Sequence, residues 1–209
     1  MNWKRTSNSP IIAPSSEDMN SDEPRFIIQQ NSDLSPQANR IYFYTDVSRE
    51  SILSLNRQID ETTKQMKIVQ LTYDLESPPP IELHICSDGG DVFAGMAAVD
   101  KIVKNSVPIH TYCEGIVASA ATFLSVSGHK RFITKSSCML IHQVSSGLWG
   151  NYKQFKEEME NLSLIMQLIK NVYVGKTKFT EEELDDILSH DLCWGSARCL
   201  EYNLVDEVI

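Results

Sequence analysis

The chain has 209 residues, of which 42% are hydrophobic and 22% charged, a composition typical of one globular domain with a substantial core. Its 28 acidic residues outnumber the 19 basic ones, and the net charge of -9 argues against a nucleic-acid-binding surface, which needs clustered Lys and Arg. No stretch of the sequence reaches the length of a membrane span, so no membrane partner is expected. The five scattered cysteines contain no C-x-x-C pair, which argues against zinc and a disulfide framework and favours small buried thiols in a reducing cytoplasm.

The first part of the chain, residues 1–37, is rich in Ser, Asn, Pro and acidic residues. We predict a flexible arm or a propeptide there, followed by one domain over residues 38–209. This domain begins with a strand at residues 40–44. A helix follows, because apolar residues recur on one face: Ile52, Leu55, Ile59, Met66 and Val69. The helix is expected to end before residues 78–80, since a proline disfavours helix in the residue before it.

A pattern of strand, glycine turn and helix then occurs twice. Alternating apolar residues at 81–85 predict a strand that runs into Gly89 and Gly90. The helix after it is expected to bury Val92, Met96, Val99 and Val103. A strand at 108–112, a glycine-containing turn into a helix at 115–121, and two short strands around Phe132 and Leu140 follow. Successive βα units of this kind predict an α/β fold with a mostly parallel sheet.

A long helix is predicted over residues 151–174. Its apolar residues are spaced three and four apart in a narrow seam: Tyr152, Phe155, Met159, Leu162, Met166, Ile169 and Tyr173. Such a seam is typical of helices that pair with another helix, so we favour contact within a homo-oligomer. The alternative is that the helix packs on the core of its own domain. Gly175 is expected to end this helix, and Thr180 with Glu183 predicts a capping box for the next one.

Several residues that could take part in catalysis or binding lie where strands end. Ser119 stands among small residues at a strand-to-helix turn, a position that taken alone favours a helix N-cap. Gly89 and Gly90 could form a tight turn or cradle an anion, although the spacings of nucleotide-binding glycine motifs are absent. His142 ends the strand at 139–141, and Asp191 follows His190 just after the capped helix. Taken singly, each of these residues is as well explained by a structural role.

Taken together, these residues match one family. Four segments carry the match: ICSDGGDVFAGMAAVD, CEGIVASAATFLSVSGHKRF, MLIHQVSSGLWG and HDLCWGSARCLEYNLVDEVI. They stand in the family's order, and the interval from Gly90 to Ser119 aligns without a gap. From residue 81 to 209 the sequence resembles the ClpP family, the proteolytic subunits of the ATP-dependent Clp protease. Two departures from the family pattern are Asp88, where a proline is usual, and Ala120, where a methionine is frequent.

The resemblance implies a role for each matching residue. Ser119 would be the nucleophile, His142 the general base and Asp191 the carboxylate that orients the histidine. The backbone N–H groups of Gly90 and Ala120 would form the oxyanion hole. The resemblance implies no cofactor and no metal.

The resemblance also implies an architecture and partners. The fold would be crotonase-like, built from repeated ββα units with a projecting handle helix that joins two stacked heptameric rings of a homo-oligomer. Unfolded protein or peptide substrates would enter the chamber with the help of a separate AAA+ unfoldase of the Clp type, in the cytoplasm. Two alternatives stay open: a crotonase-type acyl-CoA enzyme, which shares the fold, and a catalytically silent ring subunit.

Overall fold

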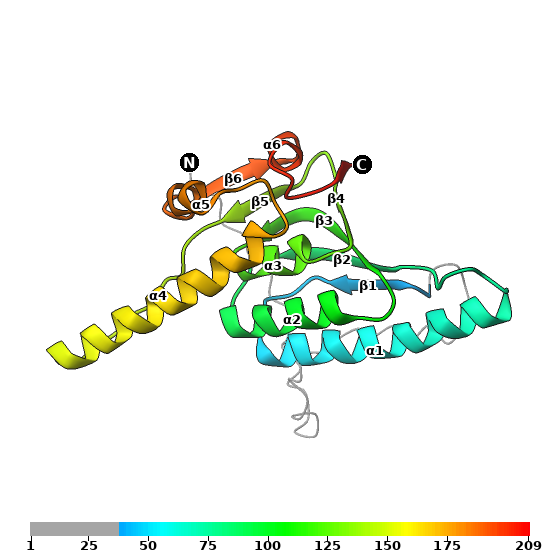
Figure 1. Cartoon of the computed structure of the whole chain (residues 1–209), viewed down its shortest axis with the longest axis horizontal. Helices are drawn as coiled ribbons and strands as arrows, with labels where there is room; N and C mark the ends of the chain where they lie inside the picture. The colour runs from blue at the N-terminus through cyan, green and yellow to red at the C-terminus, as the bar shows by residue number, and fades with distance from the viewer. Residues whose placement is uncertain (1–37) are drawn as a thin grey trace, which may run out of the picture. The chain divides into compact units, whose positions relative to one another are not determined.

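A mostly parallel sheet forms the centre of the domain in this computed structural model, which describes residues 38–209 (Figure 1). The predicted arm at residues 1–37 lies outside the described residues. The strands are β1 (Arg40–Phe43), β2 (Ile81–Ser87), β3 (Ile109–Ala118), β4 (Lys130–Ile133), β5 (Cys138–Ile141), β6 (Leu192–Gly195) and β7 (Glu207–Val208). The helices are α1 (Arg49–Thr72), α2 (Val92–Lys104), α3 (Ala120–Val126), α4 (Tyr152–Val174), α5 (Glu181–Leu188) and α6 (Ser196–Glu201).

The strand order confirms the predicted α/β class. Neighbouring strands run β1-β2-β3-β4-β7 and all of these pairs are parallel. β5 also pairs in parallel with β3, and β6 pairs with β5 in the antiparallel direction. Helical crossovers between parallel strands account for this order, because a parallel connection needs a long return segment.

β3 changes its partner halfway along its length. Residues 110–113 pair with β4, whereas residues 116–118 pair with β5. Between the two halves Gly115 adopts φ +63°, a left-handed conformation that glycine reaches without strain. The register with β2 also shifts here, between Ile85 and Ser87. The kink at Gly115 thus allows β3 to pair with β4 along its first half and with β5 along its second half.

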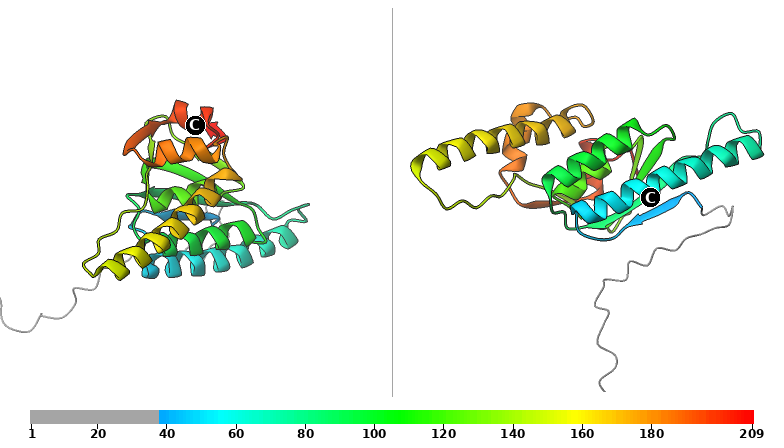
Figure 2. Two further views of the ribbon diagram at one scale, coloured as in Figure 1. Left: turned by 60° about the vertical axis from the view of Figure 1, so that its left-hand side comes forward. Right: turned by 90° about the horizontal axis from the view of Figure 1, so that it is seen from below.

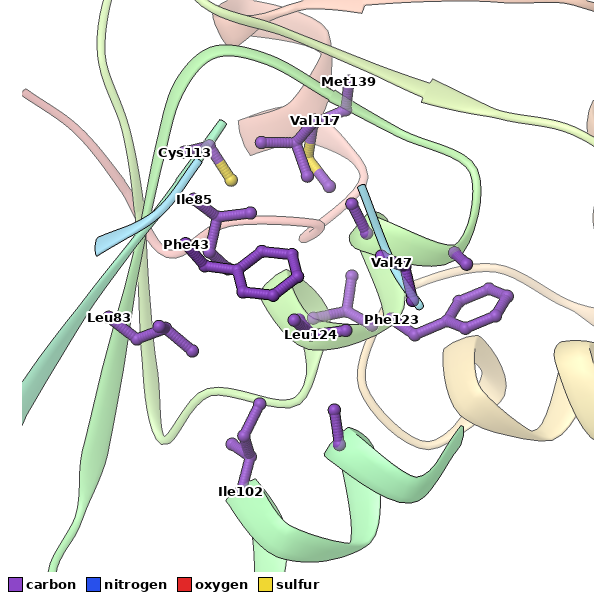
Figure 3. Packing of buried hydrophobic residues seen from close by; sticks show 14 of the residues in the cluster. Phe43, Val47, Leu83, Ile85, Ile102, Cys113, Val117, Phe123, Leu124 and Met139 are labelled. Carbon is purple, nitrogen blue, oxygen red and sulfur yellow. The ribbon is translucent and has the colours of Figure 1, made fainter. Parts of the chain in front are cut away.

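Two helices cover one face of the sheet. α1 and α2 lie side by side beneath the strands (Figures 1 and 2), and α1 begins with a capping box between Ser48 and Ser51. The predicted buried face of α1 is confirmed for Ile52, Leu55, Ile59 and Met66, with Val69 partly buried. The core between these helices and the strands contains Phe43, Leu83, Ile85, Ile102 and Leu124 (Figure 3).

The face predicted for α2 was only partly correct. Its fully buried residues are Ala94, Gly95, Ala98 and Ile102, while Val103 is exposed. The reason is a close approach to α3: a Cβ on Gly95 would lie 3.0 Å from the Phe123 ring and 3.2 Å from the carbonyl oxygen of Ala120. Small side chains therefore face the contact, and the larger valines lie at its margins.

α4 projects away from the sheet (Figures 1 and 2). Only Ile169 and Tyr173, near its C-terminal end, are buried. Met159 in the middle of the predicted seam is 63% exposed, so packing on the domain's own core explains only the last turns. Tyr152 and Phe155 are exposed as well, so the N-terminal half of the seam is an apolar face that residues 38–209 leave uncovered. None of the helices within residues 38–209 is long and apolar enough to cross a membrane.

The expectation of buried thiols holds for two of the five cysteines. Cys113 and Cys199 are buried, Cys86 and Cys138 are partly exposed, and Cys193 is exposed. All five are free thiols. Cys193 is exposed because side chains alternate along β6, and it lies on the face opposite to the buried Trp194.

Arg131 anchors the C-terminal segment to the sheet. This buried side chain forms an ion pair with Asp206 and donates hydrogen bonds to the carbonyl oxygens of Lys176, at 2.6 Å, and Asn203, at 2.9 Å. Burial alone would raise the pKa of Asp206, but the hydrogen bonds and charge of Arg131 outweigh it and hold that pKa below its usual value. The pair therefore stabilises the folded state when Asp206 is ionised.

We expect Asp206→Asn to lower the free energy of unfolding by about 2 kcal/mol at pH 7, the scale of a hydrogen bond to a charged group. Because the folded-state pKa is depressed, this contribution is complete above the unfolded pKa of about 3.9 and is lost as the pH falls through the folded value. Urea midpoints measured from pH 7 downward, at one protein concentration, should stay apart down to about pH 4 and converge only below it, as the pH passes through the folded-state pKa of Asp206.

Asp100→Asn is the matched control, because Asp100 forms only an exposed pair with Lys104 on α2. It should change the free energy of unfolding by less than about 0.5 kcal/mol. Equal stability of Asp206→Asn and Asp100→Asn at pH 7 would contradict the role given to Arg131.

Candidate active site

Ser119 lies at the junction of β3 and α3 in a strained backbone conformation. Its φ of 53° and ψ of -129° are unusual for a residue with a side chain. Ser119 occupies the N-cap position of α3, as its place in the sequence suggested, but its side chain makes no capping hydrogen bond to the helix. The backbone N–H of Ser119 instead donates to the carbonyl oxygen of Leu140 on β5, at 2.8 Å. The hydroxyl is left free of the helix and half-buried at the sheet edge.

Gly89 packs directly against Ser119. A Cβ on Gly89 would lie 2.6 Å from the Cβ of Ser119 and 2.7 Å from the carbonyl oxygen of Ala118, and the φ of Gly89 is +98°. Both facts require glycine. The next residue, Gly90, has φ +142°, and a Cβ there would lie 2.3 Å from the carbonyl oxygen of Val47.

Val47 fixes the glycine loop from the other side. Its N–H donates to the carbonyl oxygen of Gly89 and its own carbonyl oxygen accepts from the N–H of Asp91, both at 2.7 Å. Gly90 stands between these two bonds in a parallel bridge, so its own N–H takes no part in them. Nothing in the sequence singled out Val47, because its contribution is made through the backbone.

Two N–H groups are available near the serine. Ala120 is the first residue of α3, where a backbone N–H has no acceptor within the helix. The glycine loop adjoins it, since a Cβ on Gly89 would lie 3.1 Å from the Ala120 nitrogen. With the N–H of Gly90, this arrangement can accommodate a negatively charged oxygen.

His142 and Asp191 are brought together by the antiparallel pairing of β5 and β6. The last paired residues are Ile141 and Leu192, so His142 and Asp191 occupy the next rung of the same ladder. Nδ1 of His142 lies 3.1 Å from Oδ1 of Asp191. When Nδ1–H donates to this carboxylate, Nε2 carries the lone pair and can accept a proton.

Ser119 and His142 leave the sheet at the same edge. Ala118 on β3 is paired in parallel with Leu140 on β5; Ser119 follows Ala118 directly, and His142 lies two residues after Leu140. No hydrogen bond between Ser119 Oγ and His142 occurs within residues 38–209; such bonds are often long in free enzymes and close when substrate binds. His190 is not part of this group: its Nε2 lies 3.8 Å from Asp186 Oδ1 on α5.

Two further residues support the serine and were not identified as such from the sequence. Thr122 Oγ1 donates to the carbonyl oxygen of Ser119 at 2.5 Å, and the same hydroxyl lies 2.6 Å from the phenol oxygen of Tyr173 on α4. Tyr173 is buried, which raises the pKa of its phenol and keeps it protonated. It was predicted only as part of the α4 seam.

The described part of the chain contains no cluster of side chains suited to binding a metal ion. Within residues 38–209, no group of three His, Cys, Asp or Glu side chains gathers where a metal ion could bind. Asp88, which replaces the usual proline of the family, is exposed beside the glycine loop.

Comparisons with known proteins identify the family and the fold. A family model described as Clp protease matches residues 35–209. The chain belongs to the Clp protease family, which is a family of serine peptidases, and it is of the proteolytic-subunit type. Among solved structures, a point mutant of ClpP1 from Listeria monocytogenes superimposes with a TM-score of 0.71 and 20% sequence identity, over 83% of this chain and 92% of that chain. The resemblance in sequence and the predicted fold are both confirmed.

We expect Gly89→Ala to reduce the free energy of unfolding by about 2 kcal/mol or more, because a left-handed backbone with a side chain costs about 1–3 kcal/mol before the clash with Ser119 is added. Urea unfolding followed by circular dichroism measures this. Gly147→Ala is the control, since a Cβ at Gly147 meets nothing within 4 Å. A Gly89→Ala protein as stable as Gly147→Ala would contradict the close packing described for this loop.

Proposed function

We propose that the chain is a serine-type endopeptidase that hydrolyses peptide bonds of unfolded proteins, with Ser119 as nucleophile, His142 as general base and Asp191 as the orienting carboxylate. The observation that carries this proposal is the 3.1 Å contact between His142 and Asp191, at the same sheet edge as the strained Ser119. An acyl-CoA enzyme of similar fold would have no need of this histidine–carboxylate pair.

The chemistry follows from these positions. Ser119 Oγ attacks the peptide carbonyl carbon while His142 Nε2 takes its proton, and the protonated histidine then gives that proton to the leaving amine. The resulting acyl-enzyme is hydrolysed by water that the same nitrogen activates. The N–H groups of Gly90 and Ala120 stabilise the oxyanion, an effect worth about 3–4 kcal/mol for one donor in comparable enzymes.

The exposure of Asp191 favours an assembled state. Its side chain is 80% exposed in the isolated chain, and water weakens an ion pair so exposed. A neighbouring subunit that covers Asp191 would exclude water and strengthen the hydrogen bond between Asp191 and His142. We therefore assign full activity to the oligomer and not to the single chain.

The same proposal covers assembly and partners. The exposed seam of α4 supports a homo-oligomer, which we propose to consist of two stacked heptameric rings with the active sites inside. Unfolded substrates would be delivered in the cytoplasm by a separate AAA+ unfoldase of the Clp type.

Replacing the proposed catalytic groups tests the mechanism. Ser119→Ala and His142→Ala should reduce hydrolysis of short fluorogenic peptides to background, and Asp191→Asn should lower kcat by roughly 10⁴-fold because the histidine takes the wrong tautomer. A fluorophosphonate probe should label the wild-type protein and leave Ser119→Ala unlabelled.

Two matched controls accompany these variants. His190→Ala removes a neighbouring histidine that contacts only Asp186, and Ser106→Ala removes an exposed loop serine. Both should retain activity within about twofold, since surface substitutions rarely change more than ±0.5 kcal/mol. If wild type turns over peptide no faster than Ser119→Ala, while size measurements show intact rings, the peptidase proposal fails.

Assembly through α4 is tested by placing a charge on the seam. Met159→Asp should dissociate the rings from each other, because burying an unpaired charge in a helix contact costs several kcal/mol. Leu164→Asp is the control: Leu164 is comparably exposed but lies on the opposite side of α4, given about 100° per residue. Sedimentation velocity should show a smaller particle only for Met159→Asp; equal behaviour of both variants would exclude the seam as the contact.

A further inference from the structure

Two cysteines lie close to the proposed catalytic pair, on the strands that carry it. Cys138 is the first residue of β5, which leads to His142, and Cys193 lies on β6, which follows Asp191. In the ladder Cys138 is paired with Gly195, and Cys193 is paired with Leu140. Cys138 and Cys193 are therefore diagonal neighbours, two residues out of direct register.

The two thiols share one face of this strand pair. Side chains alternate along a strand, so Cys138 and Leu140 point to the same side, and Cys193 opposite Leu140 points there too. The other side is the core, where Met139 and Trp194 are buried. Burial raises the pKa of Cys138 and the neighbouring Cys193 thiol raises it further, which agrees with their closeness.

Two of the other cysteines, Cys113 and Cys199, are poor partners because they are buried. Cys113 is buried, with its sulfur 2.9 Å from Ser125 Oγ. Cys199 is buried too, and its thiol donates to the carbonyl oxygen of Trp194 at 3.3 Å. Cys138 and Cys193 are the pair that combines solvent access with a shared face.

We propose that Cys138 and Cys193 form a reversible disulfide, and that closing this bridge displaces Asp191 from His142 and lowers peptidase activity. The second half of this inference rests on the proposed function, whereas the first half does not.

The oxidant is a low-molecular-weight disulfide, such as oxidised glutathione. The exposed Cys193 attacks as the thiolate and forms a mixed disulfide, releasing one glutathione thiolate. Cys138 loses its proton and attacks Cys193 Sγ, which expels the second glutathione. In sum two protein thiols lose two electrons and two protons, and one glutathione disulfide becomes two glutathione molecules. The raised pKa of Cys138 makes this second step faster as the pH rises.

Closing the bridge has a geometric consequence. Diagonal neighbours on antiparallel strands have Cα atoms about 7–8 Å apart, whereas a disulfide requires roughly 4.4–6.8 Å. β6 must therefore shift along β5, and Asp191 is joined to β6 by one peptide bond. A displacement of about 1 Å at a catalytic group can cost on the order of 100-fold in rate, so we expect a 10- to 100-fold loss of activity.

The experiment uses the full chain in buffers of reduced and oxidised glutathione. After N-ethylmaleimide blocks the remaining thiols, trypsin cuts after Lys104, Lys135, Lys153, Lys178 and Arg198, among other sites, which places all five cysteines in separate peptides. Mass spectrometry should find residues 136–153 linked to residues 179–198 in the oxidised protein. Non-reducing gels should show the bridge within one chain and not between chains.

Cys193→Ser is the matched control. The Cys193→Ser protein should yield no linked peptide and should keep its activity in both buffers, whereas the wild type should lose activity on oxidation and recover it with dithiothreitol.

Fully alkylated Cys138 and Cys193 in the oxidised buffer, or a link between chains, would overturn the disulfide. A bridge that leaves the wild type as active as Cys193→Ser would overturn its effect on catalysis. If the reduced wild type has no activity above Ser119→Ala, the proposed function fails, and the peptide masses still decide the bridge.

Discussion

The arrangement of the active site depends on β3 changing its partner at Gly115. Before this residue β3 is hydrogen-bonded to β4, and after it to β5. A side chain at Gly115 would have to adopt a left-handed backbone, with its Cβ 3.2 Å from the sulfur of Cys86. A β3 that stayed beside β4 would leave β5 without a parallel partner. Because β3 leads to Ser119 and β5 leads to His142, this single kink determines that the two side chains meet at one edge of the sheet.

The antiparallel direction of β6 determines the third position. A residue that precedes one strand can meet a residue that follows another only if the two strands run in opposite directions. Asp191 precedes β6 and His142 follows β5, so the reversed strand places the carboxylate beside the imidazole. The same reversed ladder holds Cys193 two residues after Asp191 and Cys138 four residues before His142, which is why we propose that their chemistry bears on catalysis.

The sequence predicted the elements well and the local geometry less well. Periodicity located the parallel strands, α1 and the projecting α4, because buried faces repeat along the chain. It failed for α2, where closeness to α3 selects Gly95 and not the larger Val103 for the contact. It placed Ser119 correctly at the N-cap of α3 but did not indicate that its hydroxyl is free of the helix, since the positive-φ backbone of this residue is fixed by packing against Gly89. Thr122 could not be recognised as a support of the serine, because its partner on α4 lies 51 residues away.

The bond between Thr122 and Tyr173 also has a direction. A threonine hydroxyl has one hydrogen, and Thr122 gives it to the carbonyl oxygen of Ser119, so Tyr173 must be the donor to Thr122. The phenol, the hydroxyl and the carbonyl thus form an ordered chain of two hydrogen bonds from the base of α4 to the backbone of Ser119. Turning α4 about its axis by one residue would withdraw the phenol and leave a buried oxygen without its donor, at a cost of about 1–3 kcal/mol. The rotation of α4 about its axis and the backbone conformation of Ser119 are therefore linked through these two hydrogen bonds.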